Sequence, residues 1–174
     1  MNENDLPYLE WLEWYKNQDL PNYPMPSVTV DNVVFNRSDE IHVLVIRRKG
    51  HPFKNMLALP GGFVNPYENL QRAAARELKE ETGLESLNSQ LVGVYGDKGR
   101  DPRGWTISIA FSTVVEDFPE VIAMDDASEA FWYKLKDFEL EFLLSGDKDY
   151  FVFGFNSFAF DHAQIISDSL KMLK

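Results

Sequence analysis

The alternation of hydrophobic and polar residues divides the chain into short strand-like and helix-like segments. Apolar residues recur at helical spacing in YLEWLEWYKN (8–17), which predicts a short amphipathic helix. The polar residues 36–40 predict a hairpin turn, and helical spacing returns at 66–82 and 158–174. Runs rich in β-branched and aromatic residues predict strands at 27–35, 41–48, 56–59, 91–96, 105–115 and 129–135. Strands flanked by helices imply a sheet packed between helical layers.

Composition and charge favour one globular domain that acts on a small molecule. The 174 residues carry a formal charge of −11 and no cysteine, which excludes thiol catalysis and cysteine-based zinc sites. We expect a helical extension over residues 1–24 and one compact domain over residues 25–174. The acidic balance disfavours a nucleic-acid partner. An acidic start and the lack of a long apolar run predict a cytoplasmic protein with no membrane contact.

The segment 61–84 carries the strongest chemical signal. On a helical wheel the residues expected to enter the core form one stripe: Leu70, Ala73, Ala74 and Leu78. Three carboxylates fall on or beside that stripe: Glu77, Glu80 and Glu81. The outer side is expected to hold Arg72, Arg76, Lys79 and Thr82. Half-buried carboxylates one turn apart repel one another and lose hydration, so they favour a bound cation.

Oxygen ligands without histidine or cysteine select Mg²⁺, with Mn²⁺ as a substitute, over zinc. The glycine pair Gly61-Gly62 permits unusual backbone conformations and close approach to a ligand, and one of its carbonyls is a candidate metal ligand. Asn65 or Asn69 is expected to cap the helix, with Pro66 suited to a first helical position. The alternative is a solvated, glutamate-rich helix whose acids pair with neighbouring Lys and Arg.

The same segment resembles the signature of the Nudix hydrolases: Gly, five residues, Glu, seven residues, then Arg-Glu-aliphatic-any-Glu-Glu-any-Gly-aliphatic. The matching positions are Gly62, Glu68, Arg76, Glu77, Leu78, Glu80, Glu81, Gly83 and Leu84. The resemblance implies an α/β/α sandwich with a mixed β-sheet and Mg²⁺-dependent hydrolysis of a nucleoside diphosphate linked to a group X. It also implies that Glu77, Glu80 and Glu81 hold metal, while Glu68 and Arg76 brace the motif.

Blocks outside the motif resemble ADP-ribose pyrophosphatases and Nudix-related transcriptional regulators of NAD metabolism. They are PSVTVDNVVF, YGDKGRDPRGWTISIAF, MDDASEAFWY and FAFDHAQII. Twelve residues follow His162, whereas a DNA-binding winged helix needs at least about 50, so we expect the enzyme branch rather than the regulator branch. We therefore expect hydrolysis of ADP-ribose to AMP and ribose 5-phosphate. The alternatives are a sensor module for ADP-ribose or another nucleotide, and a Nudix hydrolase of a nucleoside triphosphate or nucleotide sugar.

The loop 95–104 concentrates basic residues in an otherwise acidic chain. Arg100 and Arg103 are candidates for phosphate contacts because a guanidinium binds phosphate oxygens in a bidentate manner. The alternative is a surface turn in which Asp101 pairs with one of these arginines. Tyr95 and Trp105 flank the loop, where they would stack on adenine or pack in the core.

Two further expectations concern acids and aromatic residues later in the chain. Asp125 or Asp126 is a candidate general base or additional metal ligand, with solvated loop acids as the simpler interpretation. His162 is expected to cap or pack against the last helix rather than take part in function. Abundant phenylalanine near the C-terminus, with Trp11 and Trp14 on the first helix, favours a homodimer.

Overall fold

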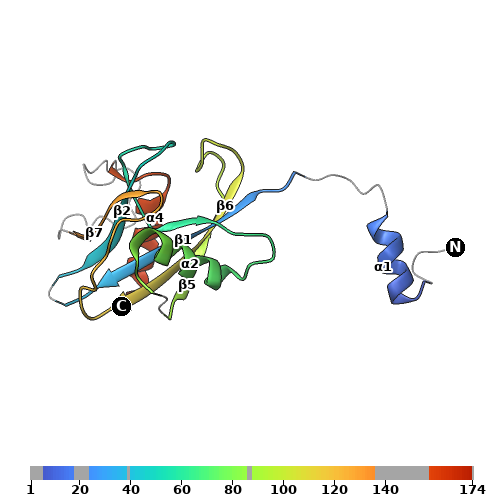
Figure 1. Cartoon of the computed structure of the whole chain (residues 1–174), viewed down its shortest axis with the longest axis horizontal. Coiled ribbons are helices and arrows are strands. Elements are labelled where there is room, and N and C mark those ends of the chain that lie inside the picture. The colour runs from blue at the N-terminus through green and yellow to red at the C-terminus, as the bar shows by residue number, and fades with distance from the viewer. Residues whose placement is uncertain (1–5, 18–23, 39, 86–87, 136–156, 174) are drawn as a thin grey trace.

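A computed structural model describes residues 6–17, 24–38, 40–85, 88–135 and 157–173 (Figure 1). Its centre is one seven-stranded sheet in which β3, β2, β1, β6 and β5 follow one another, while β4 pairs with β1 and β7 with β2. The strands are β1 (Ser27–Asn36), β2 (His42–Arg48), β3 (Leu57–Ala58), β4 (Gly61–Phe63), β5 (Gln90–Tyr95), β6 (Thr106–Val115) and β7 (Ala127–Lys134). The helices are α1 (Tyr8–Lys16), α2 (Leu70–Thr82), α4 (His162–Leu170) and the 3₁₀ turn η3 (Lys171–Leu173).

The strand β1 is the axis of the sheet. It pairs in parallel with β6 along its whole length, from Ser27 opposite Thr106 to Asn36 opposite Val115. On its other edge it pairs antiparallel with β4 near its start and with β2 near its end. The sheet is therefore mixed, as expected, and the hairpin between β1 and β2 is confirmed.

Helices cover both faces of the sheet (Figure 1). Successive strand residues point to opposite faces, and the buried side chains of β1 divide accordingly. Val30 and Val34 pack with α2, whereas Val33 and Phe35 pack with α4. This arrangement is the expected α/β/α sandwich.

The helix α2 differs in detail from its sequence prediction. It begins at Leu70 rather than residue 66, because the Asn69 side chain accepts hydrogen bonds from the backbone N–H groups of Gln71 and Arg72. Pro66 therefore lies outside the helix. Gly83 ends it in the left-handed conformation, with φ of 72°.

Two residues of α2 also face differently from their predicted sides. Thr82, expected on the outer side, is fully buried, and its hydroxyl donates to the Leu78 carbonyl. Leu70, expected in the core, is 37% exposed because it begins the helix beyond the edge of the packed region.

The glycine pair forms a strand that the sequence patterns did not predict. Gly61 and Gly62 belong to β4 and do not adopt positive φ, so conformational freedom is not why glycine stands there. A Cβ on Gly61 would lie 2.1 Å from the Val30 carbonyl oxygen, and one on Gly62 would lie 2.5 Å from a Glu77 carboxylate oxygen. Glycine is needed at Gly61 because a backbone carbonyl lies so close, whereas a side chain at Gly62 would displace the Glu77 carboxylate.

The helix α1 contains no buried residue, and its aromatic side chains stack along its own surface, Tyr8 on Trp11 and Trp11 on Tyr15. Within the described part of the chain, no helix has the length and apolar character needed to span a membrane.

The buried side chain of Asn32 links three segments of the fold. Its Nδ2 donates to the carbonyls of Pro60, at 3.2 Å, and of Ala74 in α2, at 2.9 Å.

We expect Asn32→Ala to lower the free energy of unfolding by about 1–3 kcal/mol, because two buried hydrogen bonds are lost. Urea denaturation measures this change. Thr113→Ala, which removes an exposed hydrogen bond to Asn88, is expected to change it by less than about 0.5 kcal/mol. Equal effects of both substitutions would contradict the linking role of Asn32.

Candidate functional site

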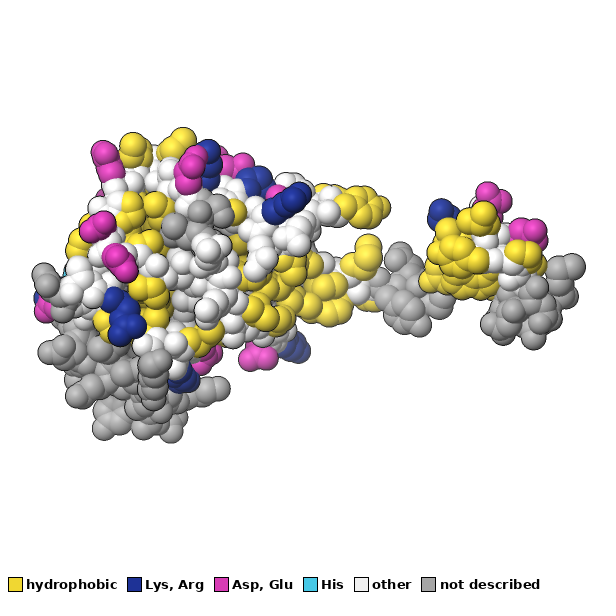
Figure 2. Space-filling model, turned by 90° about the horizontal axis from the view of Figure 1, so that it is seen from below, with side chains coloured by type: hydrophobic (Ala, Val, Ile, Leu, Met, Phe, Trp, Pro, Cys, Tyr) yellow, Lys and Arg dark blue, Asp and Glu magenta, His cyan; other side chains and the backbone are white. Residues whose placement is uncertain are grey.

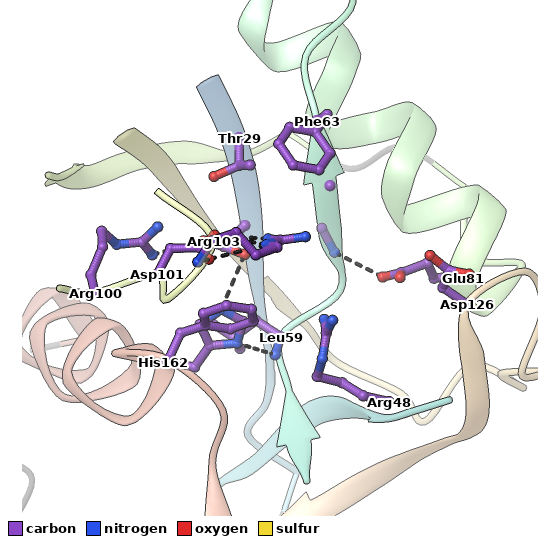
Figure 3. Close-up of a pocket in the computed structure, with 14 residues that line it drawn as sticks. Thr29, Arg48, Leu59, Phe63, Glu81, Arg100, Asp101, Arg103, Asp126 and His162 are labelled. Atoms are coloured by element: carbon purple, nitrogen blue, oxygen red, sulfur yellow. Dashed lines mark hydrogen bonds and ion pairs between the residues drawn. The ribbon is translucent and has the colours of Figure 1, made fainter. Parts of the chain in front are cut away.

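A pocket of about 100 Å³ lies where β1, β4, the C-terminal end of α2 and the start of α4 meet (Figure 3). The β5–β6 loop and the residues before β7 complete its walls. The residues that line it are Thr29, Asp31, Arg48, Leu59, Gly61, Gly62, Phe63, Glu81, Arg100, Asp101, Arg103, Asp126, Phe160 and His162. Carboxylates of Glu81 and Asp126 stand on one side of Figure 3, and guanidinium groups approach from the other.

Glu81 is a buried carboxylate at the end of α2. Its Oε2 accepts a hydrogen bond of 2.8 Å from the Gly61 N–H. Burial raises the pKa of Glu81 to about 8, and the nearby negative charges of Glu77 and Asp126 act in the same direction. This carboxylate therefore lies in an environment that disfavours its charge and would favour a cation nearby.

Asp126 reaches the pocket because the β6–β7 connection is bonded to the end of α2. The last carbonyls of the helix accept from this connection, Thr82 from the Ile122 N–H at 3.0 Å and Glu81 from the Met124 N–H at 3.1 Å. Asp126 lines the pocket. Asp125 does not, although its charge contributes to the raised pKa of Glu77.

Arg76 joins the loop after β4 to the acidic face of α2. Its guanidinium donates to both carboxylate oxygens of Glu68, at 2.9 Å each, and to the Phe63 carbonyl at 3.0 Å. It also donates to Glu77 at 2.7 Å and Glu80 at 3.0 Å. The Arg76 side chain is thus turned toward the loop, and the prediction that it faces outward is wrong. The contacts of Arg76 with Glu68 and Phe63 join the loop to the helix, as expected of a pair that braces the motif.

The carboxylates of α2 are close neighbours but point in different directions. Burial raises the pKa of Glu77, and the charges of Glu80 and Asp125 add to this effect. Glu80 is 46% exposed and bonded to Arg76, while Glu81 points at β4. Among the described residues, no group of three or more His, Asp or Glu side chains is already arranged to hold a metal ion. Arg76 and the Gly61 N–H supply positive partners to these acids instead.

The donor chemistry nevertheless fits a hard divalent cation. All candidate side-chain ligands are carboxylates, they share a half-buried position with excess negative charge, and a backbone carbonyl adjoins them. The N–H and C=O of a strand residue point to the same side. The Gly61 N–H points to Glu81, so the Gly61 carbonyl lies on the same edge of β4 as Glu81. The N–H and the carbonyl of Gly62 both point to the opposite edge, toward β1. Gly61 is therefore the better candidate of the two.

The opposite wall carries two guanidinium groups that share one aromatic ring. Arg103 lies over the rings of Phe63 and Phe160, with its Cζ at 5.2 and 5.7 Å from their centroids. It also donates to Asp101 through Nε and Nη2. Arg48, at the end of β2, lies 5.0 Å from the centre of the same Phe160 ring. Burial and the charge of Arg103 lower the pKa of Arg48.

The two predicted phosphate ligands differ in what they contact. Arg100 forms a bidentate ion pair with Asp161, at 2.6 and 2.8 Å, and only 4% of its side chain is exposed. Its predicted role as a phosphate ligand therefore needs correction, because this internal pair instead ties the β5–β6 loop to the start of α4. The Arg103 side chain is 43% exposed and faces the pocket. The alternative pairing of Asp101 with one of the arginines is confirmed.

Tyr95 is not a stacking platform. Its hydroxyl donates to Asp168 on α4 at 3.2 Å, and burial raises the pKa of Tyr95 above its ordinary value. Of the two expectations for Tyr95, packing in the core is confirmed and stacking on adenine is not supported, because the ring packs against the hydrophobic cluster that includes residues of α4. Trp105, by contrast, is 55% exposed.

Three pocket residues were missed or undervalued by sequence reasoning: Arg48, Phe160 and His162. The Leu59 N–H donates to Nδ1 of the buried His162 at 2.8 Å, and Nε2 lies 3.5 Å from Asp31. A basic residue that ends a strand and the cluster Phe160–His162 before a helix were the available signals. Neither shows which side chains meet across the fold.

Comparisons with known proteins identify the family of this chain. The NUDIX domain model matches residues 25–153, more than half of the chain, which therefore belongs to the Nudix family of pyrophosphohydrolases. An ADP-ribose pyrophosphatase from Methanocaldococcus jannaschii is 38% identical over 159 residues, or 90% of this chain and 82% of that protein.

Solved structures show the same relationship. A MutT/nudix family protein from Enterococcus faecalis superposes with a TM-score of 0.83 and 35% identity, over 98% of this chain and 71% of that one. The NUDIX domain of NrtR from Shewanella oneidensis, solved as a cocrystal with ADP ribose, gives a TM-score of 0.75 and 26% identity, over 94% and 98% of the two chains.

The environment of His162 generates a prediction about pH. Burial lowers its pKa, although Asp31 and Asp161 act in the opposite direction and Arg100 in the same one. The folded state therefore keeps the imidazole neutral, while the unfolded chain binds a proton below about pH 6.5. His162 therefore lowers the free energy of unfolding as the pH falls below that value.

We expect the unfolding free energy of His162→Gln to fall less than that of the wild type between pH 7.5 and 5.5, because glutamine does not titrate in this range. Glutamine also retains an acceptor for the Leu59 N–H. Urea denaturation at the two pH values gives the difference. His51→Gln, at an exposed turn, serves as the control and should follow the wild type. An unchanged pH dependence in His162→Gln would show that this histidine is not kept neutral by the fold.

Proposed function

We propose that this Nudix pyrophosphohydrolase cleaves ADP-ribose to AMP and ribose 5-phosphate, using Mg²⁺ with Mn²⁺ as a substitute. The observation that carries the proposal is the pocket itself, in which the buried Glu81 and the exposed Asp126 share a small cavity with the guanidinium groups of Arg48 and Arg103. A diphosphate needs positive partners on all sides, and this pocket can supply them from Arg48, Arg103 and a carboxylate-bound cation. The similarity to the pyrophosphatase of M. jannaschii supports the choice of substrate.

In the proposed mechanism, Glu77, Glu80, Glu81 and the Gly61 carbonyl would hold the divalent ion. When bound, such an ion neutralises the diphosphate and lowers the pKa of a bound water. Arg103, fixed by Asp101 and two aromatic rings, binds phosphate oxygens, and Arg48, which also lies against Phe160, binds them beside it.

The proton of the attacking water must go to a nearby base. Asp126 is the better candidate of the two predicted aspartates because it lines the pocket opposite the arginines. Its position is held by the Lys49 N–H, which donates to its carbonyl at 3.0 Å. The Asp126 carboxylate accepts the proton as the water oxygen bonds to one phosphorus of the diphosphate. The bridging P–O bond in line with it breaks, so that AMP and ribose 5-phosphate separate.

The proposal includes a cytoplasmic homodimer without a nucleic-acid partner. The charge of −11 supports the absence of nucleic acid. Hydrophobic side chains exposed on α1, among them Tyr8, Leu9 and Tyr15, support self-association (Figure 2). The second candidate function is an ADP-ribose sensor, which the likeness to the NUDIX domain of NrtR favours.

The metal assignment is tested on two glutamates of α2. We expect Glu81→Gln, and separately Glu80→Gln, to keep the fold and to lower kcat for ADP-ribose by at least about 100-fold, because each removes a metal ligand. Glu85→Gln is the matched control, since Glu85 lies outside the pocket and pairs with Lys79. Full activity in both pocket variants would refute the assignment.

A panel of ADP-ribose, NADH, nucleotide sugars and nucleoside triphosphates, each with Mg²⁺ or Mn²⁺, tests the function itself. Preferred hydrolysis of ADP-ribose supports the proposal. Tight ADP-ribose binding without turnover identifies a sensor, and preference for a triphosphate leaves the Nudix chemistry with a different substrate.

The arginine assignment is tested at Arg103. We expect Arg103→Ala to raise KM for ADP-ribose by about tenfold or more, since a hydrogen bond to a charged group contributes about 1.5–3 kcal/mol. Arg103→Lys should recover only part of the loss, because an ammonium makes no bidentate contact. Arg72→Ala, on the exposed side of α2, is the control. A lowered melting temperature with unchanged steady-state kinetics would assign Arg103 a purely structural role.

A further inference from the structure

A second cavity adjoins the pocket on the loop between β5 and β6. Its volume is about 450 Å³, and its walls include Asp97, Lys98, Pro102 and Trp105. Asp101 lines both this cavity and the pocket that holds Arg103. The two spaces are therefore neighbours that share one buried side chain.

The sizes of the two cavities suggest different occupants. The pocket of about 100 Å³ accommodates phosphate groups but not the adenosine and ribose of ADP-ribose. The second cavity falls within the range of about 300–1,000 Å³ that is usual for small-molecule sites. A substrate whose diphosphate lies between Arg103 and Glu81 must place its other parts outside the smaller pocket.

The second cavity presents an aromatic surface with polar groups around it. The Trp105 side chain is 55% exposed, and in the described residues its ring stacks on no other ring or guanidinium. Its backbone is held, because the Trp105 carbonyl accepts from the Ser27 N–H at 3.0 Å. A Cβ added at Gly99 or Gly104 would meet no atom within 4 Å, so the space beside the loop is open.

The loop itself is held in place before any ligand binds. Arg100 pairs with Asp161 on the α4 side, and the Asp101 carboxylate accepts from both the backbone and the side chain of Arg103. The Gly104 N–H donates to the Asp101 carbonyl at 3.4 Å. A fixed loop lowers the entropy lost on binding.

We propose that the second cavity binds the nucleobase of the substrate, stacked on Trp105. A nucleobase is a flat, uncharged ring with polar edges, which fits an exposed indole beside Asp97, Lys98 and loop backbone groups. Arg103 and Trp105 are two residues apart, at most about 7 Å along the chain, so one nucleotide can reach both. The proposal rests on the function proposed above and assigns the nucleoside half of ADP-ribose to this loop.

Calorimetric titration with AMP and with ribose 5-phosphate tests the proposal, because only AMP carries a base. We expect Trp105→Ala to weaken AMP binding by about tenfold and to leave ribose 5-phosphate binding unchanged. Trp105→Phe should show a smaller loss, since it keeps an aromatic face. Leu91→Ala removes a side chain of equal exposure on β5 and should change neither affinity.

Unchanged AMP affinity in Trp105→Ala, or an equal loss for both ligands, would overturn the proposal. Trp105→Phe is the second variant in case the alanine variant misfolds. A folded Phe variant that binds AMP as weakly as the alanine variant would also contradict stacking. The titrations do not depend on turnover. A wild type that binds AMP through Trp105 but hydrolyses no ADP-ribose would therefore contradict the proposed hydrolysis while supporting the nucleobase cavity.

Discussion

The segment that carries the Nudix signature depends on the contacts of the Arg76 guanidinium. This guanidinium offsets the repulsion between Glu77 and Glu80 and, through Glu68 and the Phe63 carbonyl, fixes the loop that precedes the helix. Its own pKa is raised by these partners, so it stays charged under all ordinary conditions. Several acidic side chains can therefore lie together on one face of α2 while the loop keeps a fixed position relative to the helix.

A second set of ionic contacts joins the two ends of the domain. Asp31 in β1 accepts from the Ser108 hydroxyl and faces both Arg100 and His162. Arg100 in turn pairs with Asp161 at the start of α4. The rear of the pocket is thus made of buried charges that satisfy one another, which leaves the exposed cation of Arg103 for a ligand.

Much of the fold follows from local patterns. The periodicity of β1, β2, β5, β6 and β7 and the cap of α2 are determined by residues close together in the chain, and the Nudix spacing places the acids of α2 on neighbouring positions. The strand β4 was missed because two glycines carry no periodic signal. Arg100 and Arg103 looked alike because only the folded chain brings Asp161, far along the sequence, against the first of them.

The same limit explains why Arg48 and Phe160 escaped notice. Nothing near either residue indicates that two guanidinium groups share one ring, since the contact joins the end of β2, the β5–β6 loop and the start of α4. Patterns within a segment identify elements, whereas a pocket is made by side chains from segments that are distant in sequence.

The walls of the pocket extend from Thr29 in the first strand to His162 in the last helix. Contacts between such distant residues form late, because long loops must close before they become favourable. A chain emerging from the ribosome would already have made α2 and its acids before the segment that contributes Phe160 and His162 is synthesised. The complete arrangement of charges thus becomes available only once the chain has been made as far as His162, and a shorter nascent chain would carry the signature without a finished site.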